Sequence, residues 1–376
     1  EPYHLWEQLF SPLLRQFSDT EIAPTLLFSL AAASTKTNAH GQAHLYLQEL
    51  LTKYPSSPLA PYAYLQQYPL KIYASGEKKA LAHLSRMERL FPKTPLLLPA
   101  HYLIALASLR DQYSEKGRLL KSRNLLQAIA SFQKIEMLFD AFVAEDLIPQ
   151  EQLPYFSFLR FRAWLDRSLA NTSIAESSSG TKKIIYLRYA LQSFQELLQA
   201  LPLQQDLSPL REEALFYLAK SYLSHKQHQD SAKTLVSLLS TSPDNSLWRR
   251  RGLVLQAVLL KEELRYKEAL QSLNAAEMHS LCFGFSQEEQ LQLWIEKSLC
   301  LREMGEYGES MKWLSRVINE EAASQKRIEA MLLRADLYRL EGRKALALRQ
   351  LEAVMQRGGL WGKQAKEAWD AIQSSH

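Results

Sequence analysis

The residues best suited to chemistry in this sequence are two close pairs of histidines. His40 and His44 are four residues apart, a spacing that places both imidazoles on one face of a helix, and His225 and His228 form a second pair. Imidazole nitrogens bind zinc, but a zinc site takes three or four protein ligands. Neither pair has the further ligands at a matching spacing nearby. We therefore expect polar histidines at turns, and no metal or other cofactor.

Other signatures of an active site are missing or lack their context. The run SSSG, which begins at Ser177, follows no strand that would open a phosphate-binding loop. No nucleophile is paired with a base, and no two carboxylates are placed to share a pocket. A helical-repeat enzyme of the muramidase type would also need a closed catalytic domain, for which no segment is left over. A buried acid with a raised pKa would revive that alternative, but the sequence predicts no enzyme.

Length and composition favour a helical repeat structure. A chain of 376 residues exceeds the size at which one compact core stops growing, so it forms several domains or one solenoid. Hydrophobic residues make up 47% and charged residues 23%, as in ordinary folded proteins, while twelve glycines leave little material for β-turns. The net charge of +5 is too small for a dedicated nucleic-acid binder, so we expect no nucleic-acid partner.

The cysteines and the first residue bear on the compartment of the protein. Cys282 and Cys300 cannot form a disulfide framework, and they either pair or, as we expect, stay free and buried. No run of 18 or more apolar residues is present, so no segment is predicted to span a membrane. The sequence begins at Glu1 without a methionine, so we expect that an upstream segment has been removed, and with it any signal peptide or lipid anchor.

A recurring pattern of small and apolar residues organises the chain. A small residue is followed by Tyr or Leu three positions later, a turn, and then Ala or Ser with apolar residues four and seven positions on. The pattern recurs from Leu218, Gln256, Lys297 and Arg334. Apolar spacings of three and four predict helices, so each recurrence predicts a helical hairpin. Because a hairpin cannot bury its apolar face alone, we expect the hairpins to stack and to leave a concave groove as the binding surface.

Small residues mark the points where the two helices of a hairpin are expected to cross closely. In the second helix of each hairpin they are Ala43, Ala80, Ala128, Ala190, Ala232, Ala269, Ser310 and Ala347. The apolar residues four positions later are Leu47, Leu84, Phe132, Phe194, Val236, Leu273, Leu314 and Leu351. In the first helix the small residues are Ala31, Ala219, Ala257, Ser298 and Ala335.

Turn residues between these patterns predict how the chain is divided. We expect one domain at 1–140, a hinge at 141–153 where two prolines interrupt the helical period, and a second domain at 154–376. The polar, Ser-rich connection at 171–183 is predicted to be mobile, and Pro69 to kink or break its helix. The expected helices span 22–36, 40–53, 59–74, 77–90, 96–112, 118–140, 154–170 and 182–200, followed by four hairpins from 208 to 357 and a capping helix at 361–373.

These features resemble the tetratricopeptide repeat (TPR) family, down to Tyr222 and Tyr338 in the first helix and Gly305 and Gly342 in the turn. The resemblance implies an all-α fold, a right-handed superhelical solenoid of about eight TPR-like hairpins with a C-terminal capping helix. Near the N-terminus, KYPSSPLAPYAYL and LFPKTPLLLPAHYL are similar to helix ends of bacterial periplasmic repeat proteins. The resemblance thus implies a protein-binding scaffold or adaptor in a bacterial envelope or periplasm. A cytoplasmic TPR adaptor or secretion chaperone is the alternative.

The same resemblance implies which residues face the groove. Positions 5, 9 and 12 of the first helix would line it, as an apolar ladder with three cations beside it. A protein or peptide with apolar anchors and acidic residues would suit such a surface. Alternatively, Glu262 and Glu303 neutralise two of the cations, the cations serve solubility, and the apolar residues pack internally. The sequence leaves the oligomeric state open. The predicted partner-binding residues are Phe216, Lys220, Val254, Val258, Lys261, Ile295, Leu299, Arg302, Leu332, Asp336 and Arg339.

Overall fold

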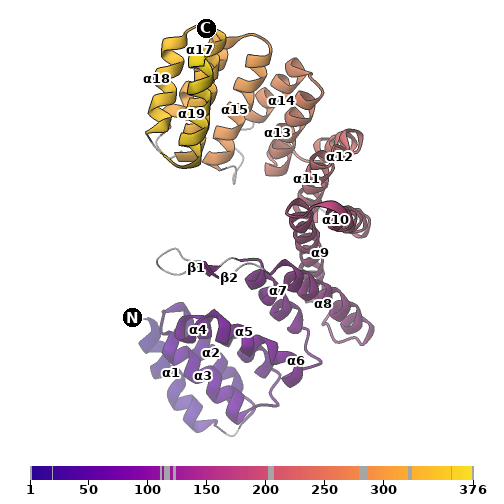
Figure 1. Cartoon of the computed structure of the whole chain (residues 1–376). Helices are drawn as coiled ribbons and strands as arrows, with labels where there is room; N and C mark the ends of the chain where they lie inside the picture. The colour runs from indigo at the N-terminus through magenta and orange to yellow at the C-terminus, as the bar shows by residue number, and fades with distance from the viewer. Residues whose placement is uncertain are drawn as a thin grey trace. The chain divides into compact units, whose positions relative to one another are not determined.

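The computed structural model describes residues 2–18, 20–110, 112–113, 119–121, 124–201, 207–278, 286–320, 324–356 and 358–374. These residues are mainly helical, and the chain divides into two compact units, Glu1–Leu197 and Leu198–His376 (Figure 1). Residues 141–153 lie within the first unit, where Phe142, Ile148 and Phe156 share one hydrophobic core. The hinge expected at these residues stays a prediction.

The first unit is a succession of packed helices with one short pair of strands. Successive helices pack as hairpins, α2 with α3, α4 with α5, and α7 with α8, and α8 packs in turn on α9. Strands β1 and β2 pair antiparallel, a local departure from the expected all-α fold. The elements are α1 Pro2–Gln16, α2 Ala23–Lys36, α3 His40–Lys53, α4 Ala60–Ser75, α5 Glu77–Ser85, α6 Met87–Leu90, α7 Leu97–Ser108, β1 Gln112–Tyr113, β2 Leu119–Lys121, α8 Leu125–Ala144, α9 Leu153–Glu176 and α10 Gly180–Ala200.

Several expectations for the helices of this unit differ from the structure, and the helix expected at 77–90 is divided into α5 and α6. Helix α8 begins at Leu125 and not near 118, because the Asn124 side chain caps it by accepting a hydrogen bond from the Gln127 backbone N–H at 3.1 Å. Helix α4 runs through Pro69 to Ser75 without a break. The connection expected at 171–183 is wrong, because α9 extends to Glu176 and buries Ala170 and Ile174, four residues apart on one helix face. The polar residues of this stretch led to the prediction of a loop, although the apolar residues among them lie on the buried face of α9.

The second unit holds the four predicted hairpins and the capping helix. Hairpins α11/α12, α13/α14, α15/α16 and α17/α18 each pack internally, and α19 packs on α18. The expected capping helix at 361–373 is confirmed as α19. The bounds are α11 Ser208–Ser224, α12 His228–Thr241, α13 Leu247–Glu262, α14 Tyr266–Met278, α15 Gln287–Glu303, α16 Tyr307–Asn319, α17 Ser324–Leu340, α18 Lys344–Met355 and α19 Gly359–Ser374.

Small residues close each of these hairpins, as expected. The pairs stand 12 residues apart, as in Ser298 and Ser310, where the Ser310 hydroxyl donates to the Ser298 carbonyl oxygen at 2.8 Å. Because a small residue on each helix lets the backbones approach, the larger apolar residues beside it can pack. All members of the pairs are at most 1% exposed, and in the second unit they are Ala219 with Ser231, Ala257 with Ala269, Ser298 with Ser310, and Ala335 with Ala347.

The register expected for α12 is wrong by one residue. The buried small residue is Ser231 and not Ala232, and its hydroxyl donates to the Ala219 carbonyl oxygen at 2.9 Å. The apolar residue four positions later is the buried Leu235, whereas Val236 is 62% exposed. Ser231 and Ala232 are adjacent small residues, and only the spacing of 12 residues from Ala219 distinguishes them.

This register predicts unequal effects of one enlargement at two adjacent positions. We expect Ser231→Leu to lower the free energy of unfolding by about 1–3 kcal/mol, because no space exists where α11 crosses α12. Ala232→Leu, at a half-buried position, should change it by about 0.5 kcal/mol or less. Urea unfolding followed by circular dichroism measures both. Equal losses in the two variants would contradict the register.

Candidate functional site

The predicted site residues all come from the first helices of the hairpins in the second unit. These helices form one row, in which α11 contacts α13, α13 contacts α15, α15 contacts α17, and α17 contacts α19. The row arises because each second helix packs behind its own first helix at the small-residue crossing. Side chains that point away from this crossing are therefore brought together from helices that are far apart in sequence.

Five of the predicted apolar residues lie half-buried along this row of helices. Each packs on the edge of a hydrophobic core while part of its surface stays accessible. We call this set the apolar row, and its members are Phe216 on α11, Val254 and Val258 on α13, Leu299 on α15 and Leu332 on α17.

The expectation that Ile295 lines the binding surface is wrong. This residue is fully buried and belongs to the core with Leu314 and Ala335. It offers no surface to a partner. Sequence reasoning also missed Trp248 at the start of α13, whose ring lies 5.5 Å from the Phe216 ring. The sequence signal for this residue was a tryptophan in the first turn of a predicted helix.

Three of the predicted cations, Lys261, Arg302 and Arg339, form ion pairs with acids of the same helix or of the next first helix. Lys261 forms an ion pair with Glu296 of α15, and not with its sequence neighbour Glu262. Arg302 contacts its neighbour Glu303 at 2.6 Å, as the sequence suggested, and Asp336 of α17 at 3.4 Å. The alternative that Glu303 neutralises Arg302 is therefore confirmed. For Lys261 the expected acid, Glu262, is wrong, because Glu296 of the next first helix forms the ion pair.

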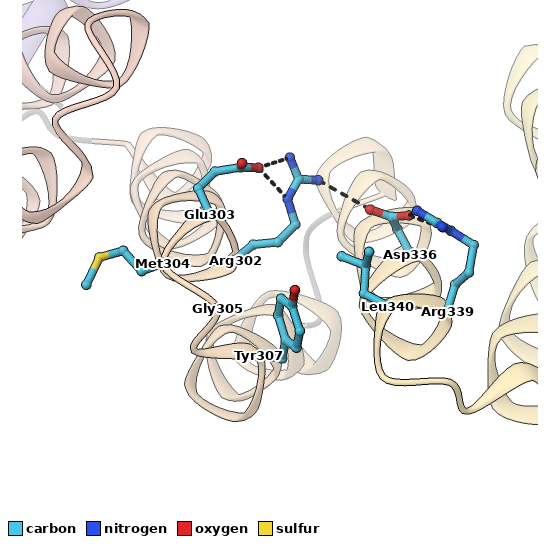
Figure 2. Close-up of a pocket in the computed structure, with 8 residues that line it drawn as sticks. All are labelled: Arg302, Glu303, Met304, Gly305, Tyr307, Asp336, Arg339 and Leu340. Atoms are coloured by element: carbon cyan, nitrogen blue, oxygen red, sulfur yellow. Dashed lines mark hydrogen bonds and ion pairs between the residues drawn. The ribbon is translucent and has the colours of Figure 1, made fainter.

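Arg339 completes this arrangement at the end of α17. Its guanidinium donates to Asp336 at 2.7 and 3.0 Å, so Asp336 lies between two arginines (Figure 2). The partly exposed ion pairs of Asp336 with Arg302 and Arg339 contribute about 0–1 kcal/mol each, so they fix side-chain positions more than they stabilise the unit. The remaining predicted cation, Lys220 on α11, is exposed.

Two hollows adjoin the Asp336 carboxylate. The first, the Arg302 hollow, has a volume of about 550 Å³ and lies between the ends of α15 and α17, with Tyr307 at its floor (Figure 2). The second, the capping-helix hollow, has a volume of about 350 Å³ and is lined by Leu332 of α17, Leu351 of α18 and Ile372 of α19. Asp336 and Arg339 line both hollows, so a charged ridge separates a polar space from a more apolar one.

Residues with potential for metal or nucleophilic chemistry are dispersed. In the described part of the chain, no three His, Cys, Asp or Glu side chains come together as a metal site. The His225 ring is hydrogen-bonded to the Ser221 carbonyl oxygen at 2.7 Å, and His228 lies 3.5 Å from Glu262. Burial raises the pKa of the Cys300 thiol to about 11, which keeps it unreactive. Cys282 lies outside the described residues.

A partly buried acid, Glu136, has the raised pKa that the enzymatic alternative requires. Burial raises the pKa of Glu136 on α8 to about 7, against the opposing charge of Arg167 on α9. The Arg167 guanidinium donates to Glu136 at 3.0 Å and also to the Ser193 hydroxyl of α10 at 3.0 Å. Glu136 thus serves a contact between helices and lines neither of the two hollows. The position of Glu136 therefore indicates a structural role and not a catalytic one.

The comparisons with known proteins concern the fold. No protein-family model and no curated protein matches the sequence. The apo form of RapI aligns with a TM-score of 0.56 and 12% identity over 93% of this chain and 97% of that one. The apo form of the quorum sensor NprR from B. thuringiensis aligns with a TM-score of 0.52 and 13% identity over 93% of this chain and 92% of that one.

A third structure, a STAND protein with a tetratricopeptide repeat sensor from Pyrococcus horikoshii, gives a TM-score of 0.53 at 13% identity. It is matched over 90% of this chain and 50% of that one. The TPR-like helical fold expected from the sequence is therefore confirmed. None of the described helices combines the length and the apolar character that crossing a bilayer requires.

Glu136 makes the stability of the chain depend on pH. Its pKa is about 7 in the folded chain against an ordinary value of 4.5, so between these values the folded chain binds a proton that the unfolded chain does not. The free energy of unfolding should therefore fall as pH rises from about 4.5 to about 7, by about 2 kcal/mol given the partial exposure of Glu136.

Urea midpoints at several pH values measure this dependence, and they should show a weaker fall for Glu136→Gln. The exposed control Glu49→Gln should keep the wild-type slope, and an unchanged slope in Glu136→Gln would contradict the assignment.

Proposed function

We propose that this chain is a protein-binding scaffold that holds a peptide segment of a partner along the first helices of its second unit. The observation that carries the proposal is the apolar row, which ends at the capping-helix hollow. Half-buried apolar side chains give an interface its affinity, because a partner completes their burial. Fixed ion pairs beside the row would give it a polar rim.

The extent of the row favours a peptide over a small molecule. Its members come from the first helices of four successive hairpins, and α19 supplies a wall of the capping-helix hollow. A compact ligand would fill one enclosed pocket, whereas an extended or helical segment contacts several helices at once. The fold supports this proposal as well, since NprR is described as a quorum sensor and the Pyrococcus protein as carrying a TPR sensor.

The compartment is a separate proposal. Pro55 and Pro92, which follow α3 and α6, stand in motifs that resemble those of periplasmic repeat proteins. They support a place in a bacterial envelope, with the cytoplasm as the alternative. Fractionation of the native cell, with detection by antibody, would decide between the two. An enzymatic role is the weaker proposal, because Glu136, whose pKa is raised, is held in a contact between helices.

The proposed function predicts that partner capture depends on the apolar row. We expect Val258→Thr with Leu332→Asn to lose most of a partner that wild-type protein captures by crosslinking in the native cell, a reduction of about tenfold or more. These changes remove apolar contact area while keeping side-chain size.

A matched control makes the same chemical changes on other helices. Val236→Thr with Leu346→Asn alters exposed residues on α12 and α18, and should leave capture unchanged. Circular dichroism and urea midpoints would confirm that both double variants are folded. Equal capture by the two variants, or loss in the control alone, would contradict the proposed site.

A further inference from the structure

One carboxylate lies between two arginines at the end of the proposed binding surface. We infer that Asp336 occupies the place of a partner's carboxylate, and that the partner is an acidic peptide segment whose carboxylate displaces Asp336 from Arg302 and Arg339. This inference rests on the proposed function and names the chemistry of its ligand. Asp336 is then a built-in competitor that sets how acidic a partner must be.

The geometry at Arg339 is that of a guanidinium binding a carboxylate. Its Nε and Nη2 atoms both donate to Asp336 Oδ1, at 3.0 and 2.7 Å. Arg302 Nη1 reaches Asp336 Oδ2 from the other side at only 3.4 Å, a long contact. A guanidinium has five N–H donors in a fixed fork, so both arginines keep donors for a second carboxylate.

The contact is accessible enough to be exchanged. Side-chain exposure is 35% for Asp336, 51% for Arg339 and 27% for Arg302. An ion pair with this exposure contributes little stability, so its replacement by another carboxylate costs little. Affinity would come from apolar anchors on the partner, and the arginines would select for an acid.

The surroundings supply one more donor and a place for an anchor. Tyr307 points its hydroxyl into the Arg302 hollow (Figure 2), and within the described part of the chain this hydroxyl has no hydrogen-bond partner. On the other side of the Asp336 ridge, the capping-helix hollow offers Leu332 and Ile372 to an apolar side chain. A carboxylate and an apolar anchor next to each other therefore match the two hollows.

The test uses a display library of random 12-residue peptides selected on the full chain. Baits are wild type, Asp336→Asn, the double variant Arg302→Gln with Arg339→Gln, and the control Arg343→Gln. Arg343 is a comparable exposed arginine that pairs with Glu341 and lines neither hollow. Fluorescence anisotropy then gives the affinity of each enriched peptide and of its counterpart with every Asp and Glu changed to Asn and Gln.

We expect Asp336→Asn to bind the acidic peptides about fivefold more tightly than wild type, which is the upper range for exposed ion pairs. It should bind the amide counterparts no better. The double arginine variant should lose the preference for acids, and Arg343→Gln should behave as wild type. Peptides that bind in competition with one another but bind equally or more weakly after Asp336→Asn would overturn this inference alone. Selection of no peptide by any bait, or of peptides insensitive to Val258→Thr with Leu332→Asn, would overturn the proposed function and the inference with it.

Discussion

The close crossing of two helices at a pair of small residues is the constraint on which the rest of this structure depends. In the second unit each pair is separated by 12 residues, and each member is almost completely buried. A larger side chain at either position would separate the helices and open the core between them. Because the second helix of each hairpin packs behind the first at this point, the first helices are left side by side, and their remaining faces form a common surface.

That surface combines two kinds of contact with different roles. The apolar row is held in position by the cores beneath it, yet leaves part of each side chain accessible. Ion pairs such as Lys261 with Glu296 and Arg302 with Asp336 join one first helix to the next. The pair of Arg302 with Asp336 is partly exposed, so it adds little stability and serves mainly to place charges at defined points. Asp336 lies between two arginines, and there the fixed charges would affect which partner is recognised.

Much of the fold follows from local patterns, whereas the site depends on neighbours that no local pattern reveals. The spacing of small and apolar residues predicted the hairpins of the second unit and the capping helix. It failed at α12, where serine replaces alanine at the crossing, and at α9, whose buried Ile174 and Ala175 stand among polar residues. The groove residues were placed by repeat position. Leu332 and Arg339 keep accessible surface, whereas Ile295 is buried in the core. Glu296 could not be assigned to Lys261 from sequence, because the contact joins different hairpins.

The central claim is that a partner lies on the first helices of the second unit. Site-specific photocrosslinking tests it most directly, with benzoylphenylalanine placed at Leu332 in one variant and at Leu346 in another. Leu332 belongs to the apolar row, and Leu346 is exposed on α18. The account predicts a crosslinked partner from position 332 and none from position 346. A partner crosslinked from position 346 alone would contradict it and would place the binding surface on the second helices.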